Sequence, residues 1–186
     1  MSHRSNEVKQ VEALKNMCLK CQNCNLYKTA TNKVFGERNP HAEIMFVGEA
    51  PGAQEDKTGR PFVGAAGKLL DALLAQINLT RDDVYITNIV KCRPPNNRNP
   101  LPEEINACIG YLKKQIELIN PEIIVTLGNV PARVLIKPNF FVTKERGKIF
   151  GVDGRIIYPT FHPAAILRNP RRRILIEEDF KQIRKI

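Results

Sequence analysis

The amino-acid sequence predicts a three-layer α/β/α sandwich around a central, mostly parallel sheet of about four strands. Short runs rich in Ile and Val alternate along the chain with longer segments in which apolar residues recur every three or four positions. The first pattern is typical of buried strands and the second of helices with one buried face. Their alternation favours helical crossovers between parallel strands. No repeat or low-complexity linker interrupts the 186 residues, so we expect a single domain over 1–186.

The first half of the chain contributes two helices and two strands to this expectation. Three apolar residues one turn apart predict a short helix over 6–18, and an apolar run that ends in glycine predicts a buried strand over 43–48. Leucines at helical spacing predict a helix over 64–79. The β-branched run at 84–90 predicts the second strand, which a proline-rich surface loop follows.

The second half continues the alternation. Apolar residues spaced 4-3-4-3 between Ile105 and Ile119 predict a helix with one buried face. A third strand is expected over 123–128, with a short helix over 130–136. Residues 148–159 are typical of a hairpin that turns at Asp153-Gly154. The chain ends in a basic amphipathic helix whose inward residues are Ile176, Phe180 and Ile183.

The charge balance favours a polyanionic partner. Lys and Arg number 29 against 19 Asp and Glu, a net charge of +10, and nucleic acid is the leading candidate for a small domain this basic. The alternative is a solvated, Lys-rich surface in a heat-adapted organism. The polar N-terminus resembles no secretory signal, and no apolar run approaches the roughly 18 residues that a membrane span needs. We therefore expect a cytoplasmic monomer with no membrane contact.

The five cysteines predict a metal centre. Cys18, Cys21 and Cys24 form a C-x2-C-x2-C run, whereas Cys92 and Cys108 lie much later in the chain. An odd number of cysteines without a secretory signal disfavours a disulfide framework, and clustered thiolates suit zinc or an iron–sulfur cluster. The wide spacing of the last two is unlike a second zinc knuckle and favours iron–sulfur. Spacing alone leaves open which of the first three is spare, and inert buried thiols are the alternative.

Three loops at the carboxyl ends of the predicted strands form the candidate site, because ligands of such sheets bind there. The first, 49–62, has the Gly and Pro residues of a tight turn whose backbone N–H groups can face a ligand. The Ser or Thr of a Walker loop is absent from it. Its carboxylates Glu49, Glu55 and Asp56 are candidate general bases or metal ligands, with ordinary loop carboxylates as the alternative.

The other two loops, 88–102 and 162–173, contribute an amide, an imidazole and a basic cluster. The side chain of Asn88 presents a donor and an acceptor suited to the edge of a base, although bonding to local backbone is equally compatible. His162 can donate a hydrogen bond to a developing anion, with a structural histidine as the alternative. The arginines that follow it favour phosphate contacts.

With these residues in place, the chain resembles the iron–sulfur uracil-DNA glycosylases of bacteria and archaea, usually called family four. The resemblance runs from Cys21 to about the final helix, nearly the whole chain, and any one of its motifs alone would be weak. The matching segments, in order, are 21–28, 48–52, 55–64, 87–95, 98–100 and 162–164. The resemblance implies the fold of that family and the removal of uracil from DNA by hydrolysis of the N-glycosidic bond, which leaves an abasic site in base excision repair.

The resemblance also implies a cofactor and its ligands. A 4Fe-4S cluster would be held by Cys21, Cys24, Cys92 and Cys108, and Cys18 has no place in the pattern. Since these ligands lie far in sequence from His162, we expect the cluster to be structural.

Roles for the pocket residues follow from the same resemblance. Phe62 would stack on the flipped uracil, Asn88 would hydrogen-bond its N3 and O4, and Glu55 would lie near C5 and exclude the methyl group of thymine. Ala50 would also contact the substrate.

The resemblance assigns the chemistry and the DNA contacts as well. His162 would stabilise charge on O2 of the leaving uracil, and Glu49 would position or activate the attacking water, although the best-known uracil glycosylases have aspartate in this motif. The loop over 166–173 would enter the DNA and hold the extruded nucleotide, through Leu167, Arg168, Arg171 and Arg172.

Two other functions remain open from the sequence. One is a glycosylase of the same fold that acts on another deaminated base, such as hypoxanthine or xanthine. The other is a non-catalytic DNA-binding module with zinc held by four cysteines. The expected partner is uracil-containing DNA, single- or double-stranded, and no motif for a sliding clamp can be detected.

Overall fold

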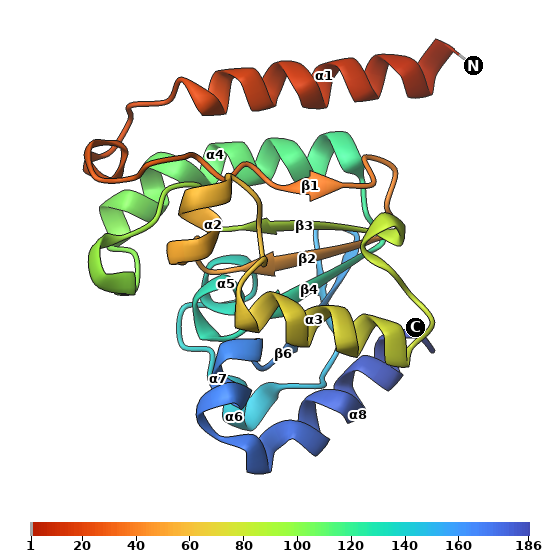
Figure 1. The fold of residues 1–186 in the computed structure, drawn as a ribbon. Coiled ribbons are helices and arrows are strands. Elements are labelled where there is room, and N and C mark those ends of the chain that lie inside the picture. The colour runs from red at the N-terminus through yellow and green to blue at the C-terminus, as the bar shows by residue number, and fades with distance from the viewer. Residues whose placement is uncertain (1) are drawn as a thin grey trace.

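A six-stranded mixed sheet forms the centre of the molecule (Figure 1). The computed structural model describes residues 2–186, with side chains from residue 6 onward. The strand order is β1-β3-β2-β4-β6-β5. The strands are β1 (Glu37–Arg38), β2 (Ile44–Gly48), β3 (Val84–Asn88), β4 (Ile123–Leu127), β5 (Phe150–Val152) and β6 (Arg155–Thr160). The four central strands are parallel, and the short strands β1 and β5 pair antiparallel at the two edges. The mostly parallel sheet of the sequence prediction is thus confirmed.

Helices cover both faces of this sheet and make the three layers. The helices are α1 (Ser2–Leu19), α2 (Ala53–Thr58), α3 (Ala65–Gln76), α4 (Pro102–Ile119), α5 (Asn129–Leu135), α6 (Val142–Glu145), α7 (Pro163–Arg168) and α8 (Arg173–Ile183). In Figure 1, α1 and α4 lie along one side of the sheet, whereas α3, α7 and α8 lie on the other. Among the described residues, no helix is long and apolar enough to cross a bilayer.

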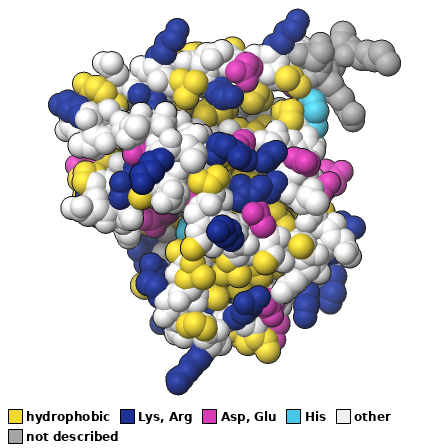
Figure 2. All heavy atoms as spheres, in the orientation of Figure 1, with side chains coloured by type: hydrophobic (Ala, Val, Ile, Leu, Met, Phe, Trp, Pro, Cys, Tyr) yellow, Lys and Arg dark blue, Asp and Glu magenta, His cyan; other side chains and the backbone are white. Residues whose placement is uncertain are grey.

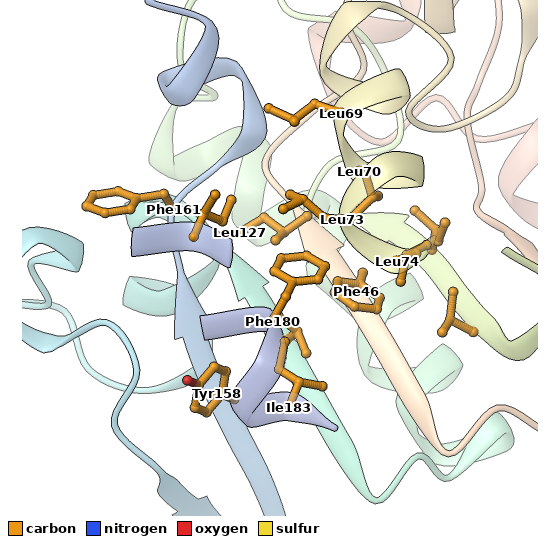
Figure 3. Packing of buried hydrophobic residues seen from close by; sticks show 14 of the residues in the cluster. Phe46, Leu69, Leu70, Leu73, Leu74, Leu127, Tyr158, Phe161, Phe180 and Ile183 are labelled. Atoms are coloured by element: carbon orange, nitrogen blue, oxygen red, sulfur yellow. The ribbon is translucent and has the colours of Figure 1, made fainter. Parts of the chain in front are cut away.

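Two apolar clusters, one on each face, hold the layers together. Successive residues of a strand point to opposite faces, so Phe46 of β2 joins one cluster and its neighbours Met45 and Val47 join the other. On the α3 and α8 side, Phe46 stacks on Phe180 with ring centroids 5.6 Å apart, beside leucines of α3 such as Leu73 (Figure 3). Both clusters extend to the carboxyl ends of the strands, where Leu127 and Phe161 belong to one and Ile89 to the other. The loops at this edge of the sheet therefore pack directly on the apolar core.

The structure adds elements that apolar periodicity did not predict. Strand β1 has only two residues, too few to show an alternating pattern. Helices α2 and α7 have six residues each and occupy segments that we expected to be loops. The polar sequence of α2 has no apolar stripe. Helix α1 also begins earlier than expected, at Ser2 rather than near residue 6.

Candidate active site and cysteine pocket

A cleft of about 520 Å³ opens at the carboxyl ends of the parallel strands, the size of a small-molecule site. It brings together eight of the predicted site residues: Glu49, Ala50, Glu55, Phe62, Asn88, His162, Arg168 and Arg172. Leu167 and Arg171, from the same segment as the last two, are exposed and lie outside the cleft lining. The carboxyl ends of the four parallel strands β2, β3, β4 and β6 thus all border one cleft, as expected for a sheet of this topology.

The carboxylate of Glu55 organises the first loop. One of its oxygens accepts hydrogen bonds from the backbone N–H groups of Val63 and Gly64, both at 2.9 Å. The other accepts the N–H of Gly52 at 3.1 Å. Both oxygens of Glu55 are therefore engaged by the chain around Phe62, a contact that the sequence alone did not reveal.

The backbone of Phe62 is held in an unusual conformation. Its φ is +51°, a left-handed value that costs energy for an aromatic residue and is concentrated at functional sites. The N–H groups of the next two residues, Val63 and Gly64, donate to Glu55, and the guanidinium of Arg81 donates to the carbonyls of Pro61 and Phe62. The ring of Phe62 lies against the cleft and is only 5% exposed.

Asn88 presents an unpaired amide oxygen in the cleft. Asn88 is the last residue of strand β3 and is 1% exposed. The Oδ1 atom of its side chain is buried and has no hydrogen-bond partner. Buried amide oxygens in proteins are nearly always bonded, so an unpaired one on a residue that lines a cleft is suited to a ligand N–H. Gly48 makes room for this arrangement, because a Cβ there would lie 2.4 Å from Asn88 Oδ1 and 2.6 Å from Phe62 Cζ.

His162 is held as a neutral imidazole. It is the N-terminal cap of α7, and its Nδ1 accepts the backbone N–H of Ala164 at 3.1 Å. Its ring stacks on Phe62 with centroids 5.5 Å apart. Burial, reinforced by the positive charge of Arg168, lowers the pKa of His162 to about 4. Because Nδ1 is the acceptor, the proton of the neutral ring lies on Nε2, which is free to donate toward the cleft.

Glu49 and the arginines set the electrostatics of the cleft. Burial raises the pKa of Glu49, an effect that the positive charge of Arg168 partly offsets. The guanidinium of Arg172 lies over the ring of Phe161, 5.3 Å from its centroid, and Arg146 lies over the same ring at 5.6 Å. Figure 2 shows Lys and Arg side chains spread over the face drawn there, with fewer Asp and Glu between them.

Several residues of the cleft were missed by sequence reasoning. Asn129 and Arg133, on α5, line it together with Thr143 on α6. A signal for them was present: Gly128 directly follows a buried strand, so its loop belongs at the same sheet edge as the loops 49–62, 88–102 and 162–173.

All five cysteines line a second pocket, separate from the cleft. It lies where the end of α1, the turn at 21–24, the segment after β3 and helix α4 meet. Cys18, Cys92 and Cys108 are buried, and burial raises the pKa of the Cys18 and Cys92 thiols to about 12. Within the described residues, no group of three or more His, Cys, Asp or Glu side chains is arranged to hold a metal ion. The kind and number of the donors nevertheless fit an iron–sulfur cluster, because thiols from three separate segments line the same pocket.

Comparison with known proteins identifies the family. The family model described as the uracil DNA glycosylase superfamily matches residues 35–185, and the chain belongs to that superfamily. Two proteins named type-4 uracil-DNA glycosylase, from Sulfurisphaera tokodaii and Thermotoga maritima, are 52% and 51% identical over 95% and 86% of this chain and 84% and 85% of their own. A type-5 uracil-DNA glycosylase from Pyrobaculum aerophilum is 34% identical over 74% of the chain and 67% of its own length. Within the superfamily, the chain belongs to the type-4 group.

Proposed function

We propose that the protein removes uracil from DNA by hydrolysing its N-glycosidic bond, which leaves an abasic site for base excision repair. The observation that carries this proposal is the buried, unpaired Oδ1 of Asn88 in the cleft, beside the ring of Phe62. The two type-4 relatives, which are named uracil-DNA glycosylases, support it.

Recognition of uracil follows from the chemistry of the amide. The N3–H of uracil donates to Asn88 Oδ1, and uracil O4 accepts from Asn88 Nδ2. Cytosine has an acceptor at N3 and a donor at C4, so it would leave both buried groups unpaired, which costs several kcal/mol in all. Phe62 supplies a ring on which the flipped base stacks, and this contact helps to offset the few kcal/mol of unstacking it from the duplex.

Glu55 excludes thymine by fixing the wall of the pocket on the C5 side. Its carboxylate holds the N–H groups of Gly52, Val63 and Gly64, so this wall, together with Ala50, cannot move back to admit a methyl group. Packed walls that do not yield make an added methyl costly.

Bond cleavage uses His162 and Glu49. As the bond from C1′ to N1 breaks, its electron pair leaves with uracil, and the sugar becomes oxocarbenium-like. The neutral Nε2–H of His162 donates to uracil O2, where negative charge develops. Water adds its oxygen to C1′ and loses a proton to the carboxylate of Glu49, whose raised pKa makes it a stronger base.

Contacts with DNA come from the segment after His162. Arg168 and Arg172 line the cleft and pair with phosphates beside the extruded nucleotide. Leu167, which is 49% exposed, and Arg171 lie outside the cleft and contact the duplex that remains stacked. The net charge of +10 adds a long-range attraction for DNA that salt weakens.

The cysteine pocket holds a 4Fe-4S cluster, with Cys21, Cys24, Cys92 and Cys108 as the ligands and Cys18 as a fifth, unligated thiol. When bound, the cluster supplies a rigid bond network between the segment at 21–24, the end of β3 and α4, and no step of base removal passes through it. Purified protein should accordingly be brown and contain iron and sulfide.

A single-uracil oligonucleotide tests the function. Cluster-loaded protein is incubated with labelled DNA that contains one uracil, with matched DNA that contains thymine or hypoxanthine, and alkali reveals abasic sites. We expect cleavage at uracil alone. Asn88→Ala removes two hydrogen bonds, about 3 kcal/mol or roughly 100-fold in kcat/KM. Asn139→Ala, at an exposed residue outside the cleft lining, is the control and should keep full activity. Excision of hypoxanthine instead, or none by loaded protein, contradicts the proposal.

A further inference from the structure

The side chain of Lys91 is a buried cation without a carboxylate partner. It is 1% exposed, and its Nζ donates three hydrogen bonds of 2.7 Å, to Thr87 Oγ1, Gln115 Oε1 and the backbone carbonyl of Asn88. All three acceptors are neutral. Among the ion pairs of the described residues, none involves Lys91. Burying a charge is costly unless an opposite charge compensates it, and no carboxylate of the described residues supplies that charge here.

The cysteine pocket is where a compensating anion belongs. Lys91 lines the pocket together with the cysteines, and it directly precedes Cys92 in the chain. Lys33 is the other cationic residue of the pocket lining and is only half-buried. A cluster with four thiolate ligands carries net negative charge, because the thiolates outweigh the positive charge of its core. The buried ammonium is therefore placed to balance it.

The same ammonium is bonded to the residue that reads the base. Its hydrogen bond to the carbonyl of Asn88 fixes the end of strand β3, from which the Asn88 side chain enters the cleft. The two side chains that accept from the ammonium are themselves held in place. Thr87 Oγ1 and Gln115 Nε2 both donate to the backbone carbonyl of Phe35. One cation thus contacts both the cysteine pocket and the backbone of Asn88.

We propose that Lys91 is the counter-charge of the cluster and the positioning residue that couples the cluster to Asn88. This inference rests on the proposed function. Bound cluster compensates the ammonium, and the ammonium holds the carbonyl of Asn88, so the amide stays in place to receive uracil. Cluster loss leaves an uncompensated buried charge directly beneath Asn88, and the end of β3 loosens. The cluster then contributes to base discrimination without taking part in bond cleavage.

The test compares two variants, Lys91→Met and Lys33→Met, each purified with its cluster. The comparison separates the specific role of Lys91 from the effect of removing any positive charge near the cluster. We expect Lys91→Met to lower the reduction potential of the cluster, because a nearby positive charge stabilises the reduced form. Bleaching of the visible absorbance by a chelator should become at least tenfold faster, and kcat/KM for uracil should fall at least tenfold. Lys33→Met should shift the potential less and leave excision within twofold of wild type. Equal bleaching rates and potentials in the two variants would overturn the proposal.

Hydrogen exchange on the wild-type protein tests the same inference if Lys91→Met fails to fold. The amides of Ile89 and Val90 donate to the carbonyls of Gly48 and Glu49 across the end of β3. Removal of the cluster under anaerobic conditions should speed their exchange at least tenfold, while the amides of β4 remain protected. Unchanged exchange at Ile89 and Val90 contradicts the coupling. These readouts do not depend on excision, so a failure of the glycosylase assay would be distinguishable from a failure of this proposal.

Discussion

Replacing Gly48 by alanine adds one methyl group at the point where the two base-contacting side chains meet. Gly48 ends strand β2 and pairs in register with Asn88 on β3. The new Cβ would lie 2.4 Å from Asn88 Oδ1 and 2.6 Å from Phe62 Cζ, whereas ordinary contacts are 3.4 Å or longer. Both side chains must therefore move by about 1 Å to relieve the overlap. A misplacement of that size in a catalytic site costs roughly 100-fold in rate, and overpacking costs about 1–3 kcal/mol of stability.

The assay is single-turnover excision of uracil with enzyme in excess, beside a thermal melt of each protein. Gly110→Ala is the matched control, because Gly110 lies on an exposed face of α4 and a Cβ there would meet nothing within 4 Å. That change should raise stability by about 1 kcal/mol and leave excision unchanged. If Gly48→Ala excises uracil within threefold of wild type while remaining folded, the tight packing of Asn88 and Phe62 against Gly48 is not what positions the base.

Three further predictions concern single side chains. His162→Ala should lower excision by roughly 100- to 1,000-fold, and since the pKa of His162 is lowered to about 4, a pH–rate profile of wild type should show no loss from its protonation above about pH 5. Arg146→Met leaves the buried carboxylate of Asp179 unpaired, which should cost about 3–5 kcal/mol in denaturant unfolding at pH 7.5. Burial raises the pKa of Asp179 to about 6, so the cost should shrink once the pH falls below that value and Asp179 is protonated; an equal cost at pH 5 would contradict this account. Gly67→Ala places a Cβ 1.7 Å from the backbone oxygen of Phe62, so the melting temperature should fall steeply. An unchanged melting temperature would show that the turn at Phe62 relaxes easily.

The parallel part of the fold was predictable because its strands and helices carry strong periodic signals. The runs at 43–48 and 123–128 are apolar on both faces, which only a sheet covered on both sides explains. The hairpin that turns at Asp153-Gly154 was also correctly predicted and supplies β5 and β6. Strand β1 was not predictable, since two residues paired with β3 owe their conformation to a partner about 48 positions away rather than to their own sequence.

The site was predictable as a location and less so as a set of contacts. The rule that parallel strands present their loops at one edge brings Glu49, Asn88 and His162 together, and the structure places all three in one cleft. The three backbone N–H groups held by Glu55 were not predictable, because they depend on how a loop folds back on a short helix. The buried ammonium of Lys91 was also missed, since a lysine beside a proline-rich loop is normally exposed to solvent.

The two edge strands of the sheet are too short to serve as templates for another strand. A long, flat outer strand offers unpaired N–H and C=O groups to any neighbouring chain, and such pairing leads to aggregation. Here the outermost strands contain only two and three residues. Neither offers enough consecutive backbone groups to begin intermolecular pairing. The short edge strands therefore leave neighbouring copies little backbone with which to extend the sheet.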